Sequence, residues 1–216
     1  MSSTGQRRAS KGTGGKPRKA GYHHGDLREA LIAAATRLVG EKGAENFTLA
    51  DACRLAGVST AAPYKHFRDR DEILEEITAR GFDAFAERSM AAVEGHGVGT
   101  LEGITAMAQA YVKFAVEHQP VFRLMFGQNP ALKSAEMVQA YGNRCLGRVI
   151  EQIGIYCERQ GVEGDAKFLG VQVWTFVHGT ASLLIDEDYA SVAPDIDLEA
   201  MVAQAVPKLL SAPAAG

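Results

Sequence analysis

The sequence predicts an all-α protein in which a small basic helical unit precedes a larger helical body. Apolar residues recur with the 3.6-residue period of a helix from about residue 26 onward. No segment shows a convincing two-residue alternation of the kind that marks a half-buried strand. Pro120, Pro130 and Pro194 divide the second half of the chain into separate helical runs.

The first predicted helix starts at Asp26, whose carboxylate can cap free N–H groups, and ends at Gly40 and Gly43. Its apolar face consists of Leu27, Leu31, Ala34, Ala35 and Leu38. Thr48 caps a short second helix that Gly57 stops, and Ser59 is expected to cap a third. These three helices form the predicted unit 22–68.

A fourth helix is predicted over 69–93, with Asp69 as its cap and an acidic first turn that suits the helix dipole. Residues 94–99 are expected to form a loop. Further helical runs are predicted at about 100–118, 120–127, 133–160, 165–186 and 196–210. Residues 69–216 therefore form the predicted body.

Composition restricts the class of protein. Hydrophobic residues make up 46% of the 216, which allows a sizeable core. No apolar run reaches the roughly 18 to 20 residues of a membrane span, and the basic start lacks the apolar region of a secretory signal. Three scattered cysteines fit a reduced interior better than a disulfide scaffold. We therefore expect a cytoplasmic protein with no membrane partner.

The charge distribution points to a polyanion, although the net charge of −3 does not. Residues 1–67 hold eleven Lys/Arg and five Asp/Glu, whereas residues 68–216 hold twelve and twenty-one. A basic head on an acidic body is expected where one end of a protein meets nucleic acid. Residues 1–21 carry several of these cations without apolar periodicity, and they are predicted to be a disordered basic arm.

The segment 51–67, "DACRLAGVSTAAPYKHF", has the pattern of a helix-turn-helix. Gly57 can take a positive φ in the turn, and the following helix can enter the major groove of DNA. Lys65 offers a cation, Tyr64 a hydroxyl, and the small Ala61 a close approach to a thymine methyl. The predicted DNA-binding residues are Thr48, Ser59, Thr60, Ala61, Pro63, Tyr64, Lys65, His66 and Arg70. An ordinary helical hairpin is the alternative.

Residues 22–80 closely resemble the N-terminal domain of TetR/AcrR-type transcriptional regulators. The resemblance rests on a Phe-Thr pair before the second helix, "AGVS", "PYKHF" and an acidic-capped fourth helix. The opening "YHHGDLR" and the later "WTFVHG" at 174–179 resemble a subgroup that carries a Trp-x-x-x-His-Gly motif. The middle of the body matches the family in its helical layout alone.

Two residues depart from the family's pattern. Pro63 stands where many relatives have another residue, and because proline lacks an N–H and constrains Ala62, it predicts a tightened or tilted recognition helix. Base contacts are therefore not transferred from relatives. Arg70 stands where the family usually has lysine, and either cation can pair with phosphate.

The resemblance implies a homodimer joined by its last two long helices, a pseudo-palindromic DNA operator and an effector cavity in each body. The wide apolar surfaces of 165–186 and 196–210 favour a partner, although a buried central helix of a monomer would also explain them. On this basis we expect a repressor that a small apolar effector releases from DNA through movement of the fourth helix.

Aromatic and Met side chains from several predicted helices suit an adaptable apolar cavity, although each also suits a core. The candidate ligand-binding residues are Phe85, Met107, Tyr111, Phe122, Met125, Phe126, Met137, Tyr141, Trp174 and His178. Trp174 and His178 share a helix face. They form either a pocket wall with a polar handle or a core pair in which the histidine is hydrogen-bonded internally.

Three rival functions have weaker support in the sequence. No paired-carboxylate, nucleophile–base, phosphate-loop or metal-ligand motif stands out, so we predict no catalytic residue, metal or cofactor. A disulfide-based redox sensor is disfavoured because Cys145 and Cys157 lie about 18 Å apart along one helix. A non-specific DNA-compacting protein would explain the basic arm but not the large apolar body.

Overall fold

The computed structural model describes residues 24–211, with side chains from residue 27. The predicted basic arm, 1–21, lies outside this range. Every regular element in the described range is helical, which confirms the all-α prediction. The α-helices are α1 (His24–Lys42), α2 (Leu49–Ala56), α3 (Arg70–His96), α4 (Leu101–Glu117), α5 (Gln119–Phe126), α6 (Pro130–Ser134), α7 (Glu136–Gln160), α8 (Ala166–Ile185), α9 (Asp188–Val192) and α10 (Leu198–Leu210). Two short 3₁₀ helices, η1 (Ala44–Asn46) and η2 (Pro63–Lys65), complete the set.

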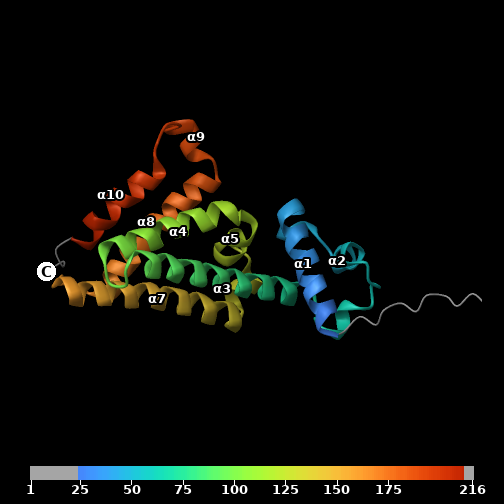
Figure 1. Ribbon diagram of the computed structural model, residues 1–216. Helices are drawn as coiled ribbons and strands as arrows, with labels where there is room; N and C mark the ends of the chain where they lie inside the picture. The colour runs from blue at the N-terminus through green and yellow to red at the C-terminus, as the bar shows by residue number, and fades with distance from the viewer. Residues whose placement is uncertain (1–23, 212–216) are drawn as a thin grey trace, which may run out of the picture.

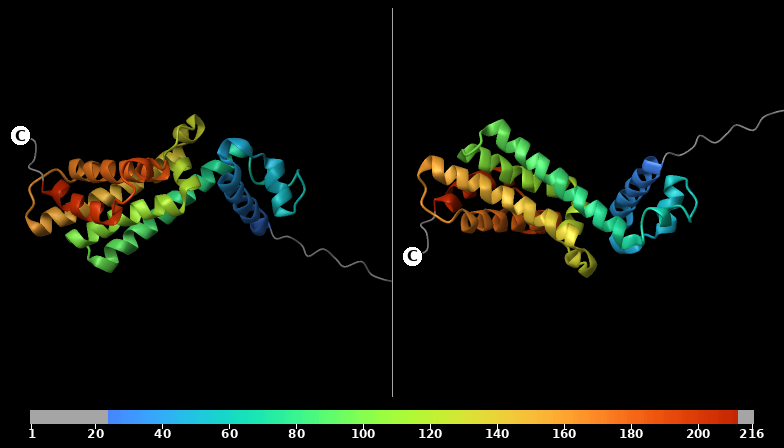
Figure 2. Two further views of the ribbon diagram at one scale, coloured as in Figure 1. Left: turned by 90° about the horizontal axis from the view of Figure 1, so that it is seen from above. Right: turned by 90° about the horizontal axis from the view of Figure 1, so that it is seen from below.

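The molecule has two lobes that share one helix. Figure 1 shows α1 and α2 at one end of the molecule, the bundle of α4 to α10 at the other, and α3 running from one lobe into the other, while α5 of the bundle also packs on α1. The two views of Figure 2 show the same separation, with α3 and α7 side by side along the bundle. Within the body, α3 packs on α4 and α7, and α8 packs on both of those helices.

Local capping signals locate α2 as predicted. The N–H of Asp51 donates to Thr48 Oγ1 at 3.1 Å, and the N–H of Thr48 donates to Asp51 Oδ2 at 3.1 Å, so the two residues satisfy each other's free groups. Gly57 ends α2 with φ 69°. Glycine takes this left-handed conformation without the steric cost of a side chain.

The boundaries of α1 differ from those predicted. The helix begins at His24, so Asp26 lies in its first turn and not at the cap position. It continues through Gly40 and ends at Lys42, because Gly43 takes φ 81° and turns the chain away.

The predicted third helix is wrong in extent. Residues 59–62 form a turn, followed by the single 3₁₀ turn of η2, and no Ser59 side-chain cap forms. The carbonyl of Ser59 instead accepts from the N–H of Ala62 at 3.0 Å. Pro63 is the first residue of η2, where its missing N–H costs least. The tightening expected from this proline is present, since a 3₁₀ turn is narrower than an α-helical turn.

Helix α3 is longer than predicted and connects the lobes. Asp69 caps it by accepting from the N–H of Glu72 at 2.9 Å, as expected. The helix continues through 94–96, which were predicted as loop, and Gly97 ends it with φ 108°. Ile73 and Leu74, near its start, are fully buried in the smaller lobe.

The remaining body helices follow the prediction with two changes. Ala135 divides the run 133–160 into α6 and α7, and the short α9 lies between α8 and α10. Within residues 24–211, α8 is the one helix long and apolar enough to cross a membrane, with 39% of its apolar window buried inside the protein. It packs against α4, α7 and α10, as a core helix of a bundle would.

Candidate DNA-binding surface and effector cavity

The turn between α2 and η2 presents a group of exposed side chains at the end of the smaller lobe. Ser59, Thr60, Ala61, Tyr64 and Lys65 are all exposed, with 66% of Tyr64 accessible. Lys65 forms no ion pair with any described residue, so its charge is available to a partner. This cluster is hereafter the turn surface.

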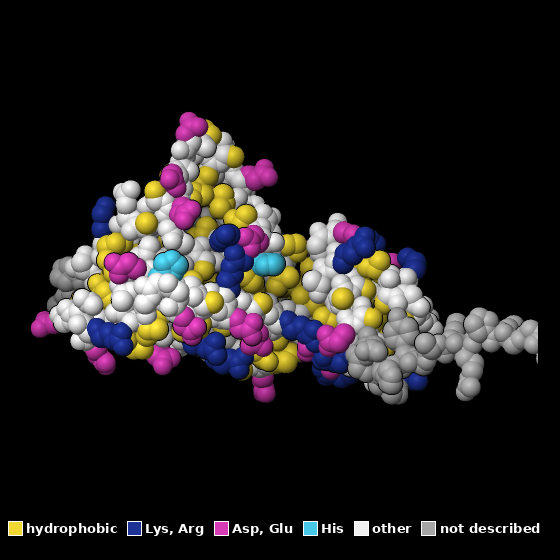
Figure 3. Space-filling model, viewed as in Figure 1, with side chains coloured by type: hydrophobic (Ala, Val, Ile, Leu, Met, Phe, Trp, Pro, Cys, Tyr) yellow, Lys and Arg dark blue, Asp and Glu magenta, His cyan; other side chains and the backbone are white. Residues whose placement is uncertain are grey.

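Further cations surround the turn surface. In Figure 3, Lys and Arg side chains appear at the top and bottom of the smaller lobe. Arg54 and Arg68 are more than three-quarters exposed. Arg54 pairs with Asp51 of the same helix at 3.1 Å, and Arg68, just before α3, pairs with Glu72 in the first turn of α3 at 3.1 Å. Exposed pairs of this kind are weak, so both cations can turn to phosphate at little cost. Neither Arg54 nor Arg68 was among the predicted DNA-binding residues.

Other predicted DNA-binding residues have structural roles in this lobe. Pro63 is buried, so it supports the turn and is not a surface contact. Thr48 is engaged in the cap of α2, and His66 is half-buried. The Arg70 guanidinium donates to the carbonyl of Glu45 at 3.4 Å and lies over the ring of Phe47, 6.0 Å from its centroid. All of these residues lie close to the turn in the sequence, so the sequence alone could not show which side chains support the lobe and which are exposed to DNA.

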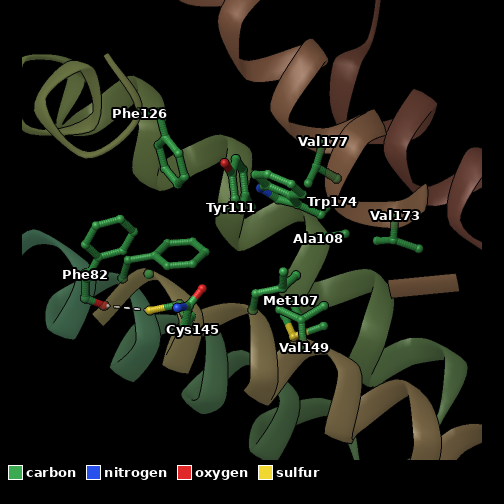
Figure 4. A pocket seen from close by; sticks show the side chains of 14 residues that line it. Phe82, Met107, Ala108, Tyr111, Phe126, Cys145, Val149, Val173, Trp174 and Val177 are labelled. Carbon is green, nitrogen blue, oxygen red and sulfur yellow. Dashed lines mark hydrogen bonds between the residues drawn. The ribbon is translucent and has the colours of Figure 1, made fainter. Parts of the chain in front are cut away.

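A cavity of about 240 Å³ lies in the body, between α3, α4, α7 and α8, with α5 at one end. Figure 4 shows aromatic and aliphatic side chains converging on it. Its wall consists of Phe82, Phe85, Met107, Ala108, Tyr111, Phe126, Gly142, Asn143, Cys145, Leu146, Val149, Val173, Trp174 and Val177. No charged side chain is among them.

The structure brings half of the predicted ligand-binding residues to this cavity. Phe85, Met107, Tyr111, Phe126 and Trp174 line it. The nine other lining residues were missed, chiefly because α7 was predicted to contribute its Met137 and Tyr141 and not the face that bears Cys145 and Val149. A helical repeat shows which residues share a face, but not which neighbour that face meets.

Five of the predicted ligand-binding residues lie outside the wall, and one of them, His178, is hydrogen-bonded to the lining residue Tyr111. Phe122 and Met125 are buried in the core around α5. Met137 is exposed, and Tyr141 is partly exposed beneath the guanidinium of Arg144, 4.4 Å from its ring centroid. These aromatic and Met residues therefore belong to the core or to the protein surface and not to the cavity wall. For Phe122 and Met125 this is the core role that the sequence analysis gave as the alternative.

Tyr111 of the cavity wall and His178 behind it form a neutral polar pair. The Tyr111 hydroxyl and His178 Nδ1 are 2.8 Å apart. Burial lowers the pKa of His178 and raises the pKa of Tyr111, with hydrogen bonding to Trp174 offsetting part of the rise. Both groups are uncharged near neutral pH. The histidine is thus hydrogen-bonded internally, while Trp174 provides the wall.

Cys145 lies in the wall as a protonated thiol. Its Sγ donates to the carbonyl of Phe82 at 3.4 Å, and burial raises its pKa to about 11. A thiol is a nucleophile only when ionised, so this one acts as wall and not as a reactive group. All three cysteines are buried and free, and no cluster of metal-ligating side chains occurs within the described range.

Two family models match the chain. "Bacterial regulatory proteins, tetR family" matches 31–77, which includes the turn surface, and "Tetracyclin repressor-like, C-terminal domain" matches 104–209, which includes most of the cavity wall. No curated protein matches the chain.

Solved structures of similar fold cover most of the chain. A protein of unknown function from Rhodococcus sp. RHA1 is 27% identical, with a TM-score of 0.75 over 91% of this chain and 97% of that one. A putative tetR family regulator from Shewanella sp. PV-4 is 18% identical, with a TM-score of 0.62 over 85% and 95%. The regulator FadR from Bacillus subtilis, solved in complex with stearoyl-CoA, is 14% identical, with a TM-score of 0.67 over 85% and 97%.

The two family models describe the same pair of domains that the structure shows, a helix-turn-helix lobe and a helical body with a cavity. Enzymatic activity is not indicated, since the family model for the first lobe and the named structural relatives describe regulators. The chain therefore belongs to the TetR family of transcriptional regulators.

Proposed function

We propose that this protein is a homodimeric cytoplasmic repressor that binds a pseudo-palindromic operator and leaves it when a small apolar effector enters the cavity. The observation that carries the proposal is α3, because this single helix contributes to both lobes. On this helix Glu76 pairs with Arg28 of α1 at 2.8 Å, and Phe82 and Phe85 line the cavity. A ligand that shifts this wall also shifts the support of the turn surface.

Two ion pairs join α1 to the first half of α3. Arg28 of α1 contacts Glu76 of α3 at 2.8 Å, and Glu29 contacts Arg80 at 2.6 Å. The guanidinium of Arg28 holds the pKa of Glu76 below its usual range. Because the pairs cross between helices, we infer that α1 and this half of α3 move as one unit.

The short α5 provides a second connection between cavity and DNA-binding lobe. A Cβ atom at Gly81 of α3 would lie 2.5 Å from Val121 Cγ1, so α5 and α3 pack closer than any other residue would allow. Phe126, at the other end of α5, lines the cavity, and Pro120 lies beside Gly40 of α1. The coupling free energy between effector and DNA then equals the difference in the free energy of effector binding between two positions of these helices.

An unpartnered apolar surface on α8 and α10 supports the homodimer. Phe168 is 50% exposed and Leu183 is 42% exposed, and Phe168 shares a hollow with Phe176 and Leu209. Exposed aromatic surface on this scale favours a protein partner. A second copy supplies a two-fold axis, which matches a palindromic site with half-sites about one turn apart.

The chemistry of the wall supports an uncharged effector. FadR of Bacillus subtilis binds stearoyl-CoA, a ligand with an anionic head, but no charged side chain lines the cavity of this chain. The segment "WTFVHG" supports membership of the Trp-x-x-x-His-Gly subgroup, since its tryptophan lines the cavity and its histidine holds Tyr111.

Selection of bound genomic fragments by the purified protein tests the proposal, at about 150 mM salt where non-specific binding is weak. We expect enrichment of one palindromic sequence, and loss of binding by a Phe168→Glu variant that is monomeric by light scattering. Uniform binding of all fragments, or undiminished binding by the monomeric variant, would contradict the proposal.

A further inference from the structure

Aromatic rings form a connected series along the wall of the cavity. The aromatic lining residues come from α3, α4, α5 and α8, and they are Phe82, Phe85, Tyr111, Phe126 and Trp174. The ring centroids of Phe82 and Phe126 are 5.6 Å apart, and those of Phe85 and Tyr111 are 5.0 Å apart, both edge to face. Tyr111 and Phe126 join the two pairs at 6.2 Å. A planar aromatic ligand can extend such a series, because rings attract one another beyond the effect of buried area.

Sulfur atoms in the wall favour the same kind of ligand. Met107 and Cys145 line the cavity, and Figure 4 shows Cys145 below the space and Tyr111 and Trp174 above it. Thioether and thiol sulfur make favourable contacts with aromatic rings. The wall therefore offers an aromatic ring attractive contacts that a saturated body of the same size would lack.

The volume of the cavity limits the size of that body. An engineered protein cavity of about 150 Å³ with an apolar wall binds benzene. On the same scale, a cavity of about 240 Å³ accommodates roughly ten carbon atoms. The space suits one substituted ring or two fused rings, and it is too small for a long acyl chain.

Asn143 of α7 is the polar side chain of the wall that stays available to a ligand. The other polar side chains of the wall, those of Tyr111, Cys145 and Trp174, are engaged in hydrogen bonds within the protein. Asn143 lines the cavity, and its side chain forms no hydrogen bond with any other residue of the described range. Because Asn143 is also exposed, it lies at the opening of the cavity.

We propose that the effector is a compact aromatic carboxamide whose ring lies among the aromatic residues of the wall and whose amide group is held by Asn143. This inference rests on the cavity being the effector site of the proposed function. An amide is the matching group, because the Asn143 side chain carries a donor and an acceptor side by side, and a ligand amide offers an acceptor and a donor in return. A ketone or a carboxylate only accepts, and a hydrocarbon forms neither bond.

Three probes that share a propyl group separate the ring from the amide. 4-Propylbenzamide has both features, trans-4-propylcyclohexanecarboxamide has a saturated ring, and 4-propyltoluene has a methyl in place of the amide. Calorimetry measures their affinities, and the emission of Trp174, the single tryptophan of the chain, shows that a probe occupies the cavity. We expect the wild-type protein to bind the benzamide about fivefold more tightly than the cyclohexane analogue.

Asn143→Leu tests the amide contact, because leucine keeps the size of the side chain and removes its hydrogen-bonding atoms. It should lower the ratio of benzamide affinity to toluene affinity about fivefold to tenfold. Gln160→Leu is the matched control, since Gln160 is an exposed amide of the same helix that does not line the cavity. Its ratio should stay at the wild-type value.

Phe126→Leu tests the ring contacts. It should reduce the preference for the aromatic over the saturated carboxamide to about twofold, because one ring of the series is lost. Phe122→Leu removes a ring from the same helix that is buried outside the wall, and it should keep the wild-type preference. Thermal unfolding of both variants separates a loss of α5 packing from a loss of ring recognition.

The length of the alkyl group tests the volume limit. From 4-methylbenzamide to 4-propylbenzamide, each added methylene should raise the affinity about threefold to fourfold by burial. Further methylenes up to a hexyl group should add little, because the cavity is then full.

Four results would overturn the inference: no preference of the wild-type protein for the aromatic ring, an unchanged amide ratio in Asn143→Leu, an affinity that keeps rising up to the hexyl group, or no binding of any probe. Fragment selection is read separately. A selected palindrome without these preferences ends this inference and leaves the proposed function standing, whereas the preferences without a palindrome do the reverse.

Discussion

The two lobes specify their structures by different means. In the DNA-binding lobe, the capping interactions that fix the helix ends join residues a few positions apart, such as Thr48 with Asp51 and Asp69 with Glu72. In the body, the cavity wall joins residues from five helices, such as Phe82 of α3 with Cys145 of α7. We infer that contacts between residues close in sequence give the DNA-binding lobe a fixed shape for DNA. Contacts between residues far apart in sequence give the cavity a wall that a ligand can rearrange.

The lobes also differ in how completely they are packed. The DNA-binding lobe buries Leu31, Phe47 and Phe67 almost fully. The body retains a cavity of about 240 Å³, and it also buries polar atoms of Ser89, Gln152 and Gln172 that have no hydrogen-bond partner in the described part of the chain. Cavities and unmet polar groups reduce stability, so we infer that the body gives up part of its stability to remain responsive.

The largest expected effect separates the stability of the two lobes. Phe47 is 1% exposed, and Phe47→Ala should destabilise the DNA-binding lobe by about 3–5 kcal/mol through the cavity it creates. Operator binding should be lost while the Trp174 emission of the body stays near that of the wild type. Thermal unfolding followed by circular dichroism, together with Trp174 fluorescence, measures both lobes.

Tyr64→Ala is the matched control for Phe47→Ala, because it removes an aromatic side chain from the same lobe at an exposed position. It should weaken operator binding without lowering thermal stability. If Phe47→Ala instead shifted the Trp174 emission strongly, the lobes would unfold as one cooperative unit, and the contrast drawn between them would be wrong.

A smaller effect is expected from the charge of the turn surface. Lys65→Ala should weaken binding and reduce the slope of log K against log salt by about 1, because one phosphate contact is lost. Lys133→Ala, an exposed cation of α6 in the body, should leave the slope unchanged. An equal change of the salt slope in both variants would show that the overall charge of the protein sets the slope and that the turn surface makes no phosphate contact of its own.

The contrast between the lobes also explains what the sequence could predict. The caps at Thr48 and Asp69 and the turn at Gly57 were located because each is encoded within four residues. Even here the third helix was mispredicted, since a turn at 59–62 and one 3₁₀ turn that starts at Pro63 stand where a helix was expected. In the body, helical periods located the elements well.

The cavity was only half predicted because its wall depends on which helix faces meet. Five aromatic or Met residues were found by composition, but Val149 and Val173 look like any core valine in the sequence.

The smallest expected effect concerns pH and belongs to the body alone. Burial lowers the pKa of His178 in the folded protein. Below the ordinary histidine pKa of about 6.5, the imidazole is therefore protonated more fully in the unfolded chain than in the folded chain. The contribution of His178 to stability is therefore complete above about pH 6.5 and declines as the pH falls below it. Urea unfolding at pH 7.5 and 5.5 should show a larger loss in the wild-type protein than in His178→Gln, which keeps an acceptor for Tyr111 but does not titrate. Equal losses would mean that the Tyr111–His178 pair tolerates the charge. The polar end of the cavity would then be as rigid as the DNA-binding lobe.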